Sequence, residues 1–251
     1  YAFSISISGS NSIISTEFHI LPKTITMDNY ITILTERPFG RWFVNSLLLS
    51  ALTVLLTMLV AVPAAYVFSR MRFAGRKRTL YILLVLNAFP AILSMFAIYR
   101  IIKTLNLLNS YMGLVFIYAG SMAIFVFWNM KGYFDTIPVE IEEAAMIDGC
   151  NPLQTFFGVV MPILKPTAIT VAILNAMWIW NDYLLPYLVI GLSTNYKTIP
   201  VVVQYLVGSY GAKDLGAMMA LLVLSVIPII VFYLTCQKYI IEGVVAGAVK
   251  G

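Results

Sequence analysis

Charged residues are scarce in this chain of 251 residues. Only 11% of the side chains are charged, whereas 61% are hydrophobic. Soluble domains carry about 25% charged residues, so this composition excludes a soluble globular protein and indicates an integral membrane protein. The sixteen Lys and Arg residues form no basic stripe of the kind that binds nucleic acid, so nucleic acid is not an expected partner.

Groups used in catalysis and metal binding are rare as well. The single histidine is His19, and the two cysteines, Cys150 and Cys236, are far apart and outside any metal-ligand spacing. Neither a metal site nor a disulfide is therefore expected. No G-x-x-x-x-G-K-[ST] sequence occurs, so the chain has no P-loop and is expected to bind no cofactor itself. A membrane enzyme is disfavoured, because the apolar runs hold no paired carboxylates and no nucleophile–base set.

Apolar runs dominate what is present, and a run of about 20 residues is enough to cross a bilayer. The expected spans are residues 43–68, 79–99, 111–130, 167–190 and 216–236. The mixed, polar residues 9–41 are expected to form an extramembrane loop. Because the chain opens without Met, its first residues are interpreted as the exit of an earlier, sixth span. The predicted fold is an all-α integral membrane protein.

Prolines fall inside four of the five expected spans, at Pro63, Pro90, Pro186 and Pro228. An interior proline removes a backbone hydrogen bond, and in lipid the freed carbonyl needs a neighbouring helix or a wet cavity. The pattern favours a bundle of kinked helices around a cavity, as in a transporter. Irregular packing is the alternative.

The sequence RMRFAGRKR gives the orientation. It places Arg70, Arg72, Arg76, Lys77 and Arg78 in one short loop after the first span. Positive charge beside a span marks the cytoplasmic side. Alternation of the spans then puts residues 135–166 and the tail 237–251 in the cytoplasm, and residues 100–110 and 191–215 outside. The alternative is that the loop is a binding patch for phosphate or lipid headgroups.

Segment 135–166 is acidic although apolar runs flank it. It holds five of the eleven acidic residues: Asp135, Glu140, Glu142, Glu143 and Asp148. Pro138 suits the first turn of a helix, Gly149 suits a helix stop, and the NPLQ sequence at 151–154 has the pattern of a capping box. Local chemistry therefore predicts a helix, a turn at Gly149, and a second helix that Pro162 ends.

The same segment resembles the EAA loop of ABC importer permeases. Glu143-Ala144-Ala145, Gly149 and Val159-x-Met161-Pro162 stand at that motif's spacing, with Val159 and Met161 in place of Ile and Leu. The neighbouring IDG and FF residues, and the ending QKYIIEGVVAGAVKG, are similar to the sugar-importer branch and to its smaller permease of the maltose-transporter type. The motif is specific, and the resemblance covers nearly the whole chain.

This resemblance implies a coupling function. Two permease subunits would pair in the inner membrane of a bacterium, and each EAA hairpin would dock into a dimer of cytoplasmic ATPase subunits that bind ATP and Mg. An extracytoplasmic sugar-binding protein would deliver the substrate, with membrane lipid around the complex. Residues implied in coupling are Glu143, Ala144, Ala145, Asp148, Gly149 and Pro162. Glu143 would supply the charged contact, the two alanines close approach, and Gly149 the turn. The alternative is a solvated acidic helix with no specific role.

The most polar expected span is 167–190. Asn175, Trp178 and Asp182 stand at helical spacing with Asn181 beside them, and Pro186 is expected to free the carbonyl of Asp182. Polar groups beside aromatic rings suit a sugar, and intramembrane acids usually face a cavity or a partner. This face is predicted to contact substrate. Alternatively, the aromatic rings belong to the interfacial belt and Asp182 binds another helix.

Two further segments are interpreted through the resemblance. Gly208, Ser209, Tyr210 and Gly211 are expected to form a flexible outer loop that contacts the binding protein, or else an interfacial re-entry helix. The tail from Glu242 to Gly251 is small and flexible, and either reaches toward the ATPase or is a frayed terminus.

Taken with the missing P-loop, these features predict a permease subunit of an ATP-driven, binding-protein-dependent importer of oligosaccharides. The alternative is a secondary transporter coupled to protons or sodium, which would show inverted repeats and several midplane ionisable residues. Only Asp182 qualifies, and no repeat is visible.

Overall fold

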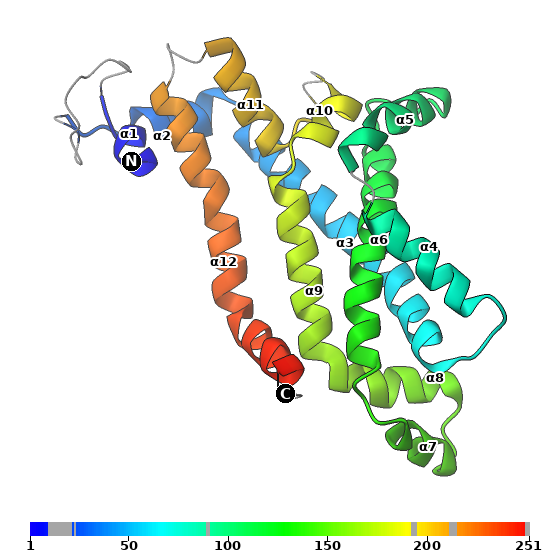
Figure 1. Ribbon diagram of the computed structural model, residues 1–251. Coiled ribbons are helices and arrows are strands. Elements are labelled where there is room, and N and C mark those ends of the chain that lie inside the picture. Colours follow the sequence, from blue (N-terminus) through cyan, green and yellow to red (C-terminus); the bar gives the residue numbers. More distant parts are fainter. Residues whose placement is uncertain (10–21, 23, 89–90, 192–194, 211–214, 249–251) are drawn as a thin grey trace. The chain divides into compact units, whose positions relative to one another are not determined.

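The computed structural model describes residues 1–9, 22, 24–88, 91–191, 195–210 and 215–248, and Figure 1 shows their course. Regular structure in these ranges is helical, apart from an isolated antiparallel bridge between Ser8 and Ile25. Within these ranges, the all-α prediction is confirmed.

Within the described residues, four helices are long and apolar enough to cross a membrane: Phe39–Arg70, Tyr111–Phe134, Pro152–Asn181 and Leu215–Lys238. They correspond to α3 (Phe39–Arg70), α6 (Tyr111–Phe134), α9 (Met161–Asn181) with the turns before it, and α12 (Leu215–Ala248). Pro63, Pro166 and Pro228 lie inside α3, α9 and α12.

The expected span at 79–99 is not one unbroken helix. The chain instead forms α4 (Arg76–Ala88) and α5 (Ala91–Thr104), and the helical stretches Arg76–Ala88 and Leu93–Thr104 are bent by 102° against each other. Pro90, one of the four prolines predicted to kink a span, lies outside the described residues. Apolar length alone could not reveal this break. The pair counts as a fifth span only if it is taken as one broken span.

The prediction of a single span at 167–190 also needs correction. Helix α9 ends at Asn181, and a separate helix α10 (Leu184–Ile190) follows. Asp182 explains the restart, because its carboxylate Oδ1 accepts a hydrogen bond of 3.0 Å from the backbone N–H of Leu184. Pro186 is therefore in the first turn of α10, where a missing N–H costs little, and it does not free a carbonyl inside a long helix.

The remaining helices are α1 (Ala2–Ser6), α2 (Asp28–Ile31), α7 (Val139–Ile147), α8 (Pro152–Thr155) and α11 (Ile199–Tyr210), with π-helical turns η1 (Thr32–Glu36) and η2 (Phe156–Val160). Two expected flexible segments are helical instead. Gly208, Ser209 and Tyr210 end α11, whereas Gly211 lies outside the described residues. Helix α12 continues to Ala248, so the segment expected to be a flexible tail is helical up to that residue.

Contacts divide the chain into two units. Unit 1 comprises Tyr1–Ala51, Ala97–Leu114 and Trp178–Tyr233, and unit 2 comprises Leu52–Phe96, Val115–Met177 and Leu234–Gly251. Segments predicted to lie outside the cell all belong to unit 1, and those predicted to lie inside all belong to unit 2.

Unit 1 is organised around two tryptophans and α11. Trp42 and Trp180 are buried with Ile199 and Leu221, and the indole Nε1 of Trp180 donates to the carbonyl of Ser225 at 3.2 Å. Because the indole N–H has a partner, this large side chain is buried without an unsatisfied donor.

The core of unit 2 joins α3, α6, η2 and α9. Its fully buried members include Ala65, Met130, Phe134 and Val160. Helix α4 reaches this core only through Leu80 and Leu83, which are partly buried. Unit 2 also contains the acidic segment 135–166.

Candidate functional site

The acidic segment folds as a helix, a tight turn and a second helix, as predicted. The turn at the end of α7 is a Schellman motif. The N–H of Cys150 donates to the carbonyl of Ala145 at 3.0 Å, and the N–H of Gly149 donates to that of Met146 at 3.1 Å. Gly149 has a φ of +93°, a conformation that only glycine adopts cheaply.

The second helix begins with the predicted capping box. The side chain of Asn151 accepts from the N–H of Gln154 at 2.9 Å, and the side chain of Gln154 accepts from the N–H of Asn151 at 2.8 Å. Pro152 occupies the first helical turn. The sequence from 149 to 154 therefore fixes the geometry of the turn by local chemistry alone.

Pro162 does not end the second helix, contrary to the prediction. Helix α8 passes through η2 into α9, in which Pro162 is the second residue. The N–H of Met161 donates to the carbonyl of Phe156, five residues back, so the turn before the proline is widened. A proline ring in a regular helix clashes with the carbonyl four residues back. The widened turn moves that carbonyl aside, so the helix continues past Pro162.

Helix α7 has a buried face and an exposed face. Glu142 and Ala145 are buried, at 3% and 8% exposure, whereas Glu143, Ala144 and Asp148 are exposed. Glu143 is thus free to meet another chain. Ala145 is not available for close approach to a partner, because it already packs inside this chain.

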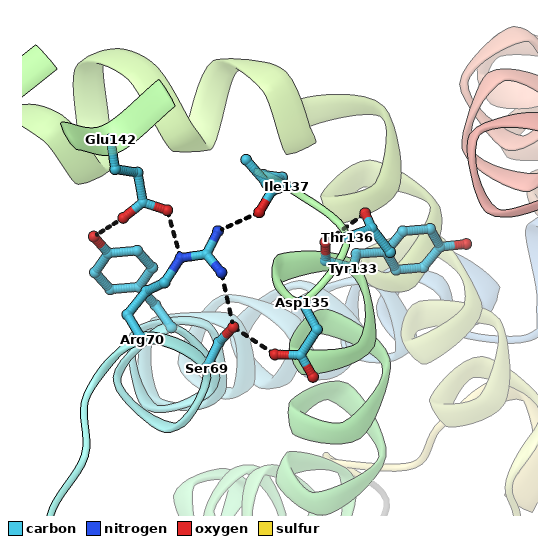
Figure 2. A network of polar contacts seen from close by, with 8 residues as sticks. Ser69, Arg70, Tyr133, Asp135, Thr136, Ile137 and Glu142 are labelled. Atoms are coloured by element: carbon cyan, nitrogen blue, oxygen red, sulfur yellow. Dashed lines mark hydrogen bonds and ion pairs between the residues drawn. The ribbon is translucent and has the colours of Figure 1, made fainter. Parts of the chain in front are cut away.

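A buried ion pair joins α7 to the end of α3 (Figure 2). The guanidinium Nε of Arg70 donates to Glu142 Oε1 at 2.5 Å, and the hydroxyl of Tyr66 donates to Glu142 Oε2 at 2.7 Å. Arg70 Nη2 also donates to the carbonyl of Ile137 at 3.0 Å, just before α7. Both carboxylate oxygens are satisfied, which is the condition under which a buried charge is tolerated. We call Tyr66, Arg70 and Glu142 the clamp.

A second, more exposed branch extends from the clamp. Ser69 Oγ donates to Asp135 Oδ1 at 2.6 Å, and Lys131 Nζ donates to Asp135 Oδ2, also at 2.6 Å (Figure 2 shows the first of these contacts). Asp135 is 44% exposed, whereas Glu142 is 3% exposed. Because solvent screens exposed pairs, the clamp carries more of the attachment than this branch.

Aromatic packing attaches the second helix of the hairpin. Phe156 is buried, and its ring centroid lies 4.8 Å from that of Tyr66 and 6.3 Å from that of Phe134. Tyr66 therefore contacts both hairpin helices, one through its hydroxyl and one through its ring. The hairpin is attached on both sides to α3 and α6.

The sequence alone assigns different roles to the clamp residues. In the sequence, Glu142 is one of several neighbouring acidic residues, and Arg70 indicates only the orientation of the chain in the membrane. One sequence signal indicates that Glu142 is buried. Glu142 and Ala145 are three residues apart and share a helix face, so a helix that buries Ala145 also buries Glu142. No sequence pattern identifies Arg70 and Tyr66 as its partners.

The residues predicted to contact substrate do not share one environment. Asn175 is fully buried, and neither atom of its side-chain amide has a hydrogen-bond partner among the described residues. Trp178 is 55% exposed, and Asn181 is exposed at the last position of α9. Asp182 lies beyond the helix, so its predicted i, i+7 relation to Asn175 fails. Their role in substrate binding stays a prediction.

Cysteine and histidine offer no second site in the part of the chain that the structure describes. Cys150 and Cys236 are free cysteines, and the described residues contain no group of three or more His, Cys, Asp or Glu side chains that could hold a metal ion. His19 lies outside the described residues. The acidic hairpin clamped to α3 remains the best-defined candidate site.

A set of apolar helices long enough to cross a membrane, with a clamped hairpin that exposes acidic side chains, defines a multi-pass membrane protein. The chain belongs to the family described as binding-protein-dependent transport system inner membrane component, which matches residues 57–245. It is therefore a multi-pass protein of the inner membrane.

Individual relatives agree with this assignment. The chain is 32% identical to the probable starch degradation products transport system permease protein AmyC of Thermoanaerobacterium thermosulfurigenes, over 92% of this chain and 83% of the relative. It is 33% identical to the maltodextrin transport system permease protein MdxG of Bacillus subtilis, over 90% of this chain and 81% of the relative.

A solved structure is similar along nearly the whole chain. It is the crystal structure of a bacterial ABC transporter involved in the import of the acidic polysaccharide alginate, with a TM-score of 0.83 and 27% identity. The match covers 95% of this chain and 88% of that chain. These comparisons favour an ABC permease over a proton- or sodium-coupled transporter.

Proposed function

We propose that this chain is a permease subunit of an ATP-driven importer of oligosaccharides, which receives its substrate from a sugar-binding protein. Family membership supports the permease role, and the names of the relatives support the substrate class: starch degradation products, maltodextrin and alginate are all carbohydrates. The observation that carries the coupling role is the hairpin. The clamp holds it rigidly, and its Glu143 is exposed.

The hairpin serves as the receiver of force from a separate ATPase. The chain has no P-loop, so ATP and Mg are bound by that partner. Glu143 is exposed on the face of α7 opposite the buried Glu142 and Ala145, which leaves its carboxylate for a basic group of the ATPase. Ala144, beside it, is small and exposed and permits close approach.

The clamp and Phe156 pass displacement of the hairpin into the membrane helices. A helix joined only by exposed contacts would tilt without moving its neighbours, because such contacts are weak. Here the buried pair ties α7 to α3, and Phe156 packs against both Tyr66 and Phe134. Movement of the ATPase would therefore displace α3, α6 and α9 together, and open the pathway alternately to each side.

A second, homologous permease subunit completes the pathway. The surface of Trp178 and Asn181, with Asp182, is our proposed substrate contact, and the end of α11 at Gly208, Ser209 and Tyr210 is our proposed contact with the binding protein. These roles place substrate handling in unit 1 and coupling to the ATPase in unit 2.

Charge reversal of Glu143 tests the coupling role. Glu143→Lys is expected to leave the permease folded, because the side chain is exposed, while ATPase association or substrate-stimulated ATP hydrolysis falls at least about tenfold. Transport and ATP hydrolysis are measured in vesicles that contain the whole complex with its binding protein.

Glu36→Lys is the matched control, because Glu36 is also exposed but belongs to η1 of unit 1. Its transport and ATP hydrolysis should stay close to wild type. Unchanged coupling in Glu143→Lys would contradict the proposed docking role, and equal losses in both variants would assign the effect to net charge.

A further inference from the structure

The loop between α3 and α4 gathers cations that have no acidic partner in the described part of the chain. Arg72, Lys77 and Arg78 are exposed, and none of them forms an ion pair with any described residue. Lys77 and Arg78 lie in the first turn of α4, where the helix dipole disfavours positive charge. Their charges therefore repel one another and the helix end until an anion neutralises them.

The loop holds these cations in an ordered arrangement. Arg76 Nε donates to the carbonyl of Phe68 at 2.7 Å, and the ring of Phe73 stands edge-on to that of Phe68 at 5.0 Å. Gly75 makes the turn into α4 with a φ of +89°. The chain folds back on the end of α3, so the basic side chains border a defined hollow.

Two hollows adjoin at these side chains, one cationic and one apolar. The cationic hollow, about 830 Å³ in volume, is lined by Arg72, Phe73, Gly75, Arg76, Lys77 and Arg78. Its size lies in the range of about 300–1,000 Å³ that is typical of small-molecule pockets. Lys77 and Arg78 also border a second, apolar hollow of about 530 Å³ on α4.

The apolar hollow continues along the same helix. It is lined by Tyr81, Ile82, Val85 and Leu86 in addition to the two basic residues, and those four side chains are 52–70% exposed. Residues 78, 82 and 85 follow the three- and four-residue spacing of one helix face. A ligand that fills both hollows must carry negative charge at one end and a hydrocarbon chain at the other.

We propose that this surface binds an anionic phospholipid, whose phosphate meets Arg72, Lys77 and Arg78 while an acyl chain lies along Tyr81, Ile82 and Val85. A free phosphate would satisfy only the cations, and a neutral lipid would satisfy only the apolar face. Clusters of Lys and Arg beside a membrane helix attract anionic lipid. The proposal does not depend on which substrate the protein transports.

Lipid retention by purified protein tests the site. The full-length chain in its complex is placed in nanodiscs of phosphatidylcholine with one fifth phosphatidylglycerol, and bound phosphatidylglycerol is counted by native mass spectrometry after transfer to detergent. Lys77→Gln with Arg78→Gln should lower the affinity for phosphatidylglycerol at least about fivefold, and leave phosphatidylcholine retention unchanged.

Arg100→Gln with Lys103→Gln is the matched control. These residues are also exposed, lie on α5, and carry the same charge. A photoactivatable phosphatidylglycerol should crosslink within residues 72–86 in the wild type and in the control, and at least about fivefold less in the Lys77/Arg78 variant.

Three results would overturn the proposal. The first is a loss of phosphatidylglycerol in the control variant that equals the loss in the Lys77/Arg78 variant. The second is that inorganic phosphate competes as effectively as lipid does. The third is that α4 crosslinks to the second permease subunit in place of lipid. The first would show unspecific attraction, the second a phosphate site, and the third a protein interface.

Discussion

At the residue scale, the decisive interaction is the one that Glu142 makes with Arg70 and Tyr66. The side chains of Glu142 and Arg70 are only 3% and 12% exposed, so water screens the two charges weakly. Glu143, the next residue, points the other way and is exposed. Adjacent glutamates on one helix thus differ in environment, because one is buried in the clamp and the other is exposed at the surface.

Removal of one clamp partner should loosen the hairpin. Arg70→Ala leaves Glu142 buried without its counter-charge, which typically costs about 3–5 kcal/mol. Hydrogen exchange of the α7 amides should then accelerate, and transport should fall. The double variant Arg70→Met with Glu142→Leu removes both charges and should recover much of the protection, because an apolar pair needs no counter-charge.

Lys131→Ala is the control for this experiment. It breaks the pair with Asp135, whose side chain is 44% exposed, and exposed pairs contribute about 0–1 kcal/mol. Exchange in α7 should therefore change little. Protection that stays at the wild-type level in Arg70→Ala would show that the hairpin is held by its apolar contacts alone.

At the scale of elements, three features of the backbone shape the hairpin. Two of them follow from neighbouring residues in the sequence, and the third does not. The Schellman turn at Gly149 and the capping box of Asn151 and Gln154 fix the angle between its two helices. The π turn at η2 lets the second helix pass Pro162 and continue into α9. The helical path from Pro152 to Asn181 is thereby unbroken.

A side chain at position 149 should damage this element. Gly149→Ala forces a non-glycine residue to a φ of +93°, at an expected cost of about 1–2 kcal/mol. The melting temperature of the purified complex should fall, and the ATPase should dissociate more readily on co-purification.

The matched control is Gly132→Ala in α6. A methyl group there meets nothing within 4 Å, and no positive φ is involved, so this variant should be as stable as wild type or slightly more. Equal melting temperatures for both variants would show that the turn tolerates a side chain and that its geometry is not strained.

At the scale of the whole chain, every segment predicted to be outside falls in unit 1, and every segment predicted to be inside falls in unit 2. The basic loop, the hairpin and the last part of α12 belong to unit 2. This sidedness has a direct test.

Cysteine labelling should reveal opposite sidedness for the two units. In a variant without Cys150 and Cys236, a cysteine at Glu36 should react with an impermeant maleimide added to intact cells, since Glu36 is exposed in unit 1. A cysteine at Ala74, exposed in the basic loop, should react only after the membrane is permeabilised. Labelling of Ala74→Cys in intact cells would reverse the topology and remove the docking proposal with it.

The sequence by itself determined the features that depend on neighbours along the chain. Scarce charge and long apolar runs indicated a membrane protein, and cap chemistry predicted the turn at Gly149 and the start at Asn151. These predictions succeed because a cap acts within a few residues and a span is one continuous run of about 20 residues. The EAA spacing then identified the family.

Only the tertiary structure decided which residues meet across the chain. It paired Glu142 with Arg70, 72 residues apart, and buried Ala145. It also broke the expected spans 79–99 and 167–190, ended the shared face of Asn175 and Asp182, and made helix of the segments around Gly208 and after Cys236. Each of these outcomes depends on long-range packing and on local hydrogen-bond competition, which apolar length and residue spacing do not report.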